Sequence, residues 1–184
     1  MVEDELTVLS ALNEAHTAEF FHEHSGHDFQ PYDTFMWSVE MAEWWQAWTG
    51  GMKADGAQFR AFGQDGSGGL AAFWLRQPDE RLDHQPIIFL GSEGEFAVIA
   101  HDLGDYLWLL ANGVGPLETI DGIERTPEPI VGLTQIAQRY TGSGQRSTSE
   151  VIAAAQTLLP DLTAMIDACS ADGRRHQIRT PPPA

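Results

Sequence analysis

The stretch FRAFGQDGSGGLAAFWL, residues 59–75, holds two short apolar runs on either side of a glycine-rich turn. Both runs are rich in aromatic and small apolar side chains, and each is too short for a helix, so they indicate buried strands. Asp65-Gly66 and Gly68-Gly69 favour a tight turn, because glycine adopts positive φ at no steric cost. We therefore expect a β-hairpin.

Two further runs of the same kind follow, QPIIFLG at 85–91 and EFAVIA at 95–100. Short strands that follow one another with brief polar connections are typical of an antiparallel meander. Leu6, Leu9, Leu12 and Ala15 recur at helical spacing, so residues 3–24 predict an amphipathic helix with this stripe inward.

Further helices are expected to flank the strands. SVEMAEWWQAWTGG is typical of a helix with Ser38 as its N-cap and Gly50-Gly51 as its stop. HDLGDYLWLLANGVGP is typical of another, which Asp102 can cap and which ends at Gly113 and Pro116. Three more helical segments follow at 130–142, 148–159 and 161–170. We predict an α+β fold with a mostly antiparallel sheet of about four to six strands flanked by helices. Residues 1–172 are expected to form one domain, and GRRHQIRTPPPA, residues 173–184, is expected to be a disordered tail.

Charge is unevenly distributed along the chain. The formal net charge is −17, and residues 1–130 hold 23 acidic and five basic side chains, whereas residues 131–184 hold four and five. Such an acidic body repels phosphate backbones and anionic lipid, so neither nucleic acid nor membrane is expected as a partner. A basic macromolecule would be attracted, although solubility alone explains the same charge equally well.

The sequence also suggests a compartment. No run of about eighteen apolar residues is present, and the opening MVEDELTVL is acidic where a secretory signal is basic. Cys169 is the single cysteine and has no internal partner for a disulfide. We expect a cytoplasmic protein.

Several catalytic motifs fail on their context. Gly66, Gly68 and Ala71 satisfy G-x-G-x-x-A, but a dinucleotide site needs a helix to open there, and LAAFWLRQ reaches Pro78 too soon. No Gly-Lys-Ser/Thr follows for a phosphate loop, and Ser67 and Ser92 lack the G-x-S-x-G elbow. We therefore predict no catalytic residue, no enzymatic activity and no cofactor.

A histidine cluster keeps one enzymatic alternative open. HEHSGHD places His22, His24 and His27 beside Glu23 and Asp28, all of which are metal-capable side chains. Gly26 interrupts the helical spacing and no H-E-x-x-H is present, so histidines at a helix end are the favoured interpretation and no metal is expected. The alternative is a small metal-dependent hydrolase that uses this cluster.

Acidic turns are the candidate binding residues. GSEGEF puts Glu93 and Glu95 at a turn across from Asp65, and RQPDERLDHQ adds Asp79, Glu80 and Asp83 at the neighbouring connection. Solvated turn carboxylates are commoner than catalytic pairs, and in one rim they suit contact with a basic partner. We expect these six carboxylates to form such an acidic rim.

FRAFGQDGSGGLAAFWL, followed by PIIFLGSEGEFAVIAHDLGDYLWLLANGVGP, resembles the SUKH superfamily over about residues 58–116. Phe62-Gly63 precedes the Asp65-Gly66 turn, Gly69 opens the next strand and Trp74 ends it. Pro86 starts another strand, and Gly91-Ser92-Glu93-Gly94 precedes the last. The first 57 residues lack the usual Leu-Pro and Asn-Gly-Gly of such proteins, and the C-terminal helices lie outside the match. The structural positions of the motif are Gly63, Gly66, Gly69, Trp74, Gly91 and Gly94.

The resemblance implies an α+β binding module with no enzymatic activity. Bacterial members are implied to be immunity proteins that neutralise a cognate toxin, often a nuclease, whereas fungal members are regulators of endogenous proteins. The expected function is therefore neutralisation of a basic partner, such as a polymorphic toxin, by an acidic surface. A regulatory scaffold is the alternative, and the sequence indicates neither the partner's identity nor an oligomeric state.

Overall fold

The computed structural model describes residues 2–20, 29–51, 55–122, 126–141, 144–171 and 176–179. Its helices are α1 (Val2–Phe20), α2 (Ser38–Thr49), the 3-10 turn η1 (Leu82–His84), α3 (Leu103–Ala111), α4 (Glu118–Asp121), α5 (Val131–Thr141), α6 (Thr148–Gln156) and α7 (Leu159–Cys169). Its strands are β1 (Phe29–Pro31), β2 (Phe59–Asp65), β3 (Leu70–Trp74), β4 (Ile87–Leu90), β5 (Glu95–Ala100) and β6 (Gln177–Ile178).

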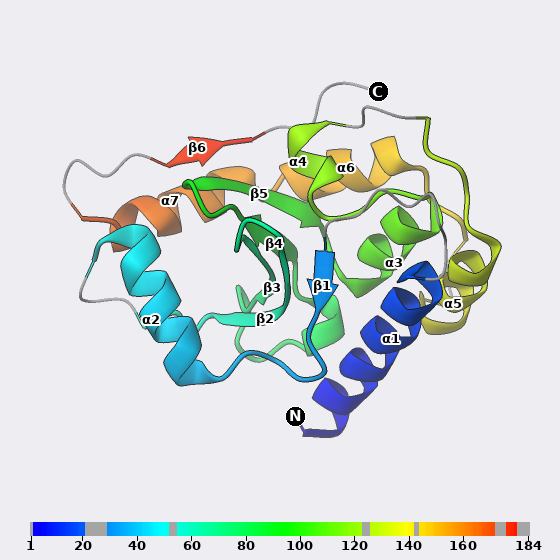
Figure 1. Cartoon of the computed structure of the whole chain (residues 1–184), viewed down its shortest axis with the longest axis horizontal. Helices are drawn as coiled ribbons and strands as arrows, with labels where there is room; N and C mark the ends of the chain where they lie inside the picture. The colour runs from blue at the N-terminus through cyan, green and yellow to red at the C-terminus, as the bar shows by residue number, and fades with distance from the viewer. Residues whose placement is uncertain are drawn as a thin grey trace.

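The strands form one six-stranded sheet in the order β1-β2-β3-β4-β5-β6. Neighbours from β1 to β5 pair antiparallel, and β6 pairs parallel with β5. The predicted α+β class and the meander over β2–β5 are confirmed. Figure 1 shows α2 and α7 on one side of this sheet and α1, α3 and α5 on the other.

Both faces of the sheet are buried, which explains strands that are apolar throughout. Phe73 and Phe89 face one core together with α1, α3 and α5, whereas Leu70 and Ile88 face a second core with α2 and α7. Alternate strand residues point to opposite faces, so a strand covered on both sides reads as a continuous apolar run. Trp74 and Phe89 are core residues.

Helix boundaries follow local signals with two corrections. Gly50 ends α2 at φ 67°, and the Asp102 carboxylate accepts a hydrogen bond from the Asp105 N–H at the start of α3. Ser38 is not an N-cap, because Trp37 occupies that position without a side-chain bond. The stripe of α1 is confirmed at Leu12 and Ala15, which are buried, but Leu6 is 63% exposed, and Val8 and Ala11 are buried in addition.

The sequence did not predict β1 or β6. The three residues of β1 include Pro31 and carry no apolar period, and their pairing with Gly63–Asp65 places them at the sheet edge. Gln177 and Ile178 of β6 lie within the tail that was expected to be disordered, and backbone pairing to β5 holds them there. Exposed side chains give such a strand no periodic signal.

Among the described residues no single helix is long and apolar enough to cross a membrane. Helices α6 and α7 reach that length and composition only as a pair, and they are bent by 49° at the break between them.

Candidate functional site

Asp65 organises the β2–β3 turn and does not lie on a binding rim. Its side chain is 4% exposed, and Oδ1 accepts hydrogen bonds from Ser67 N, Ser67 Oγ and Gly69 N at 2.9, 2.8 and 2.8 Å. A carboxylate engaged in this way closes the loop on itself. The positive φ of the turn belongs to Gly68, at 90°, and not to Gly66.

The other motif glycines allow close approach between strands. A Cβ on Gly63 would lie 2.8 Å from the Gln30 carbonyl oxygen, and one on Gly69 would lie 2.8 Å from the Phe89 ring. Gly91 would meet the Glu95 carboxylate at 2.5 Å, and Gly94 has φ 97°. These positions therefore serve the sheet and its turns.

Glu93 lies in the β4–β5 turn and Glu95 is the first residue of β5, beside the Asp65 turn as expected. Ser92 Oγ donates a hydrogen bond to Ser67 Oγ across the two turns at 3.0 Å. Glu95 is half-buried and its Oε2 accepts from Glu93 N at 3.1 Å, whereas the Glu93 side chain is exposed. This pair leaves one exposed carboxylate at that end of the sheet.

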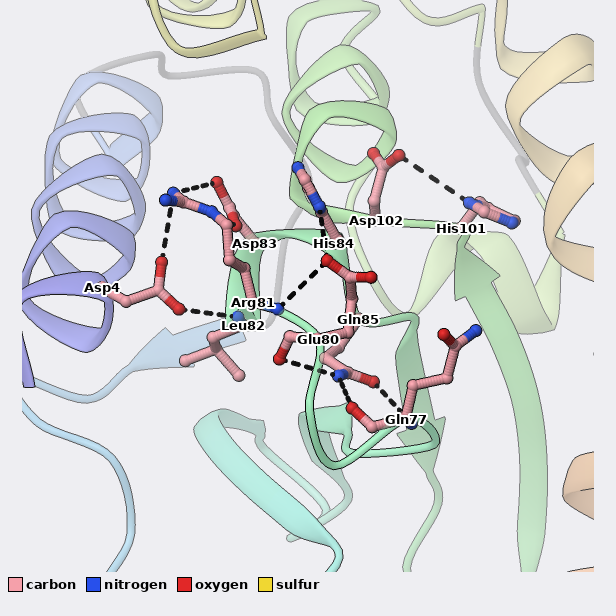
Figure 2. A network of polar contacts seen from close by, with 10 residues as sticks. All are labelled: Asp4, Gln77, Glu80, Arg81, Leu82, Asp83, His84, Gln85, His101 and Asp102. Atoms are coloured by element: carbon pink, nitrogen blue, oxygen red, sulfur yellow. Dashed lines mark hydrogen bonds and ion pairs between the residues drawn. The ribbon is translucent and has the colours of Figure 1, made fainter. Parts of the chain in front are cut away.

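Glu80 and Asp83 belong to a polar network in the connection between β3 and β4 (Figure 2). Glu80 Oε1 lies 3.0 Å from His84 Nδ1, and Arg81 donates to Asp83 at 2.9 and 2.8 Å. These bonds lower the pKa of the Glu80 and Asp83 carboxyls. The Leu82 N–H donates to Asp4 of α1 at 2.8 Å, which ties the connection to the helix layer.

The six predicted carboxylates do not form one rim. In an antiparallel meander the β2–β3 and β4–β5 turns share one end of the sheet, and the β3–β4 connection lies at the other. The five residues of β3 separate these ends by about 16 Å at a strand's rise. Asp79 is exposed at the far end, remote from Glu93.

His22, His24 and His27, with Glu23 and Asp28, lie outside the described residues. Among the residues that the structure describes, no group of three or more His, Cys, Asp or Glu side chains is placed to hold a metal ion.

A groove between the start of α2, the start of β2 and the segment before α2 is the candidate site. It encloses about 650 Å³, and Trp37 and Val39 on its wall are 74% and 68% exposed. Sequence reasoning missed Trp37 because this residue precedes Ser38, the expected N-cap, and so lies outside the helical spacing that indicates burial. Trp37 occupies the N-cap itself, with extended backbone angles of φ −62° and ψ 144°. We call this site the Trp37 groove; its lining residues are Glu5, Phe35, Met36, Trp37, Ser38, Val39, Met41, Ala42, Glu43, Gln46, Asp55, Gly56, Ala57, Phe59 and Arg60.

Carboxylates outnumber basic groups in the Trp37 groove. Glu5, Glu43 and Asp55 line it against Arg60. The Arg60 guanidinium lies 3.8 Å from Glu5 and also donates to the Phe59 carbonyl oxygen at 2.9 Å, so its charge is already engaged. The described lining thus combines apolar side chains with an excess of negative charge.

Three further arginines of the described chain are likewise paired with specific acids. Arg76 contacts Asp161 at 2.5 Å, and Arg139 contacts Glu14 at 2.6 Å. Arg146 pairs with buried Asp105, whose pKa is nevertheless raised because burial and Asp102 outweigh that pair. Several acidic residues outside these pairs, among them Asp79 and Glu93, are exposed to solvent.

Comparison of the chain with protein-family models, with curated proteins and with solved structures gave no match. Membership of the SUKH superfamily therefore stays a prediction.

Proposed function

We propose that this chain is a non-enzymatic protein-binding domain that takes a basic partner at the Trp37 groove. The observation that carries the proposal is the coincidence of two exposed apolar side chains, Trp37 and Val39, with a groove lined by Glu5, Glu43 and Asp55. The apolar ring of a tryptophan this exposed is removed from water when a partner covers it, which is why such residues are typical of binding interfaces.

The two kinds of group have different tasks. Trp37 would act as the anchor, because partly apolar aromatic side chains at the centre of an interface carry most of its affinity. The carboxylates would select and steer a basic partner, because complementary charge raises the association rate more than the final affinity. An apolar segment bearing Lys or Arg at its flanks fits both.

A toxin is the partner class that we favour. The resemblance of residues 58–116 to the SUKH superfamily supports it, since bacterial members are implied to neutralise cognate toxins. Nucleases that grip a polyanion are commonly basic, so an acidic groove would be attracted to such a partner. The single cysteine supports a cytoplasmic location for this encounter.

The test begins with capture of the partner from the producing cells, followed by binding kinetics with the purified pair. Trp37→Ala is expected to weaken binding by roughly thirtyfold, about 2 kcal/mol. Val131→Ala is the matched control, because Val131 is 72% exposed on α5 and does not line the groove. Equal binding by wild type and Trp37→Ala would overturn the site.

Charge reversal separates the groove from the acidic connection that the sequence suggested. Glu43→Lys is expected to slow association at low salt by roughly tenfold, whereas Asp79→Lys at the exposed β3–β4 connection is expected to change it little. The reverse order would refute the groove. Expression of the captured protein in cells, with and without this chain, decides whether it is a toxin: rescue of growth that fails with Trp37→Ala supports immunity, and a harmless partner removes that part of the proposal.

A further inference from the structure

The outer edge of β5 is covered by the chain's own C-terminal segment (Figure 1). β6 pairs with it in the register Glu95↔Gln177 and Phe96↔Ile178. The Gln177 N–H donates to the Gly94 carbonyl oxygen at 2.8 Å, and the Arg179 N–H donates to the Phe96 carbonyl oxygen at 3.0 Å. The segment thus lies along the first half of β5 as an added parallel strand.

His176 holds the start of this strand. Its ring stacks on Trp48 of α2 with centroids 4.0 Å apart and an interplanar angle of 29°. Nδ1 lies 3.3 Å from Ser170 Oγ, and Nε2 lies 3.3 Å from the Trp48 carbonyl oxygen. One ring therefore positions the strand at the end of the sheet where the β4–β5 turn lies.

Beyond His176 the strand buries little of its own surface. Gln177, Ile178 and Arg179 are all exposed, and Ile178 keeps 48% of its surface in water. Backbone hydrogen bonds at an exposed edge stabilise weakly, because water competes for the same groups. The strand is therefore held far less firmly than the buried strands beside it.

The segment and the turn beside this edge carry charges of opposite sign in the sequence. The sequence GRRHQIRT places Arg174, Arg175 and Arg179 within six residues. The edge itself begins at Glu95, and the exposed Glu93 lies two residues before it. An arginine-bearing extended segment thus occupies the sheet edge that carries the acidic turn.

We propose that the outer edge of β5 is a second binding site, for an extended arginine-bearing segment of a partner protein, and that residues 176–179 occupy it in the free chain. Main-chain hydrogen bonds of an added strand would provide the affinity, and Glu93 would favour basic sequences. The partner segment replaces β6 by exchange. The site shares no lining residue with the Trp37 groove, so it stands independently of the function proposed there.

The first test uses the full chain and a labelled peptide of its own residues 173–184. Replacing both Gln177 and Arg179 with proline removes the two N–H donors that pair with β5. This variant is expected to bind the peptide at least tenfold more tightly than wild type. Ile178→Pro is the matched control. Alternate N–H groups of a strand face opposite ways, so this substitution removes an N–H that does not pair with β5, and the variant should bind the peptide as wild type does. A double-proline variant that folds and binds no peptide would overturn the site.

Two further measurements keep the proposal testable if the double variant fails to fold. In wild type, hydrogen exchange at the amides of Gln177 and Arg179 is expected to be at least a hundredfold faster than in the middle of β5, because β6 opens separately. Equal protection of β6 and β5 would contradict the replacement of β6 by a partner segment. Added to the double variant, Glu93→Gln should weaken peptide binding threefold or more at low salt, and a peptide with glutamine in place of arginine should bind equally weakly to both. No effect of Glu93→Gln would remove the selection of basic segments.

Discussion

At the scale of single residues, Asp65 shows how a carboxylate can stabilise a turn from inside. Asp65→Ala removes the acceptor of three hydrogen bonds and leaves the buried Gly69 N–H without it. The free energy of unfolding should fall by about 2–3 kcal/mol, measured by urea denaturation. Asp65→Asn keeps an acceptor oxygen and should cost less, and Ser67→Ala should cost least. A loss below about 0.5 kcal/mol for Asp65→Ala would contradict this role.

Two aspartates predict pH effects of opposite sign. Burial and the nearby Asp102 raise the pKa of Asp105, and its Oδ2 atom has no hydrogen-bond partner among the described residues. Arg81 lowers the pKa of Asp83. Because the pKa of Asp105 is raised, the stability that Asp105 contributes is lost as pH rises through that raised pKa. The stability that Asp83 contributes is lost as pH falls through its lowered pKa.

The stability difference between Asp105→Asn and wild type should therefore move in the variant's favour as pH rises from about 3 to about 8. For Asp83→Asn the difference should move the other way over the same range. Urea unfolding of the three proteins at matched ionic strength measures both slopes. Slopes of the same sign would refute the two environments.

At the scale of secondary-structure elements, two glycines separate close packing from helix propensity. A Cβ on Gly63 of β2 would press on the Phe29 ring of β1 and on the Gln30 carbonyl oxygen, so Gly63→Ala should destabilise by about 1–3 kcal/mol. Gly132 in α5 has open space around a Cβ, so Gly132→Ala should stabilise by up to about 1 kcal/mol. Thermal unfolding measures both, and a neutral Gly63→Ala would mean that β1 is not tightly docked.

The same elements explain what the sequence could predict. β2 to β5 are covered on both faces, so their residues are apolar throughout and the strands can be predicted from these runs. Asp102 and Gly50 mark helix ends, because each forms a local hydrogen bond there. β1 and β6 depend on backbone pairing to partners more than thirty residues away, which leaves no periodic pattern. The rim of carboxylates failed for a topological reason, because turns on opposite ends of a meander look adjacent in sequence. Trp37 gave no signal because it lies just before the expected N-cap, Ser38, and so outside the helical pattern.

At the scale of the whole molecule, the net charge of −17 acts on folding and on binding at once. Ion pairs such as Arg76–Asp161 and Arg139–Glu14 neutralise single acids, and the remaining carboxylates repel one another over the surface. Raising sodium chloride from low to physiological concentration screens this repulsion and should raise the Tm by several degrees. The triple variant Glu40→Gln, Glu43→Gln, Asp55→Asn should start from a higher Tm at low salt and respond less.

The same screening should slow association with a basic partner, because the attraction and the self-repulsion arise from one field. Salt is therefore expected to stabilise the free chain and weaken its encounter rate together, in stopped-flow and calorimetric series on one preparation. The triple variant should lose part of both dependences, since it removes charge near the Trp37 groove. If the Tm does not change with salt while association slows, the acidic charge acts on the partner alone. If salt slows association of the triple variant as much as that of wild type, the charge that steers the partner lies away from the groove.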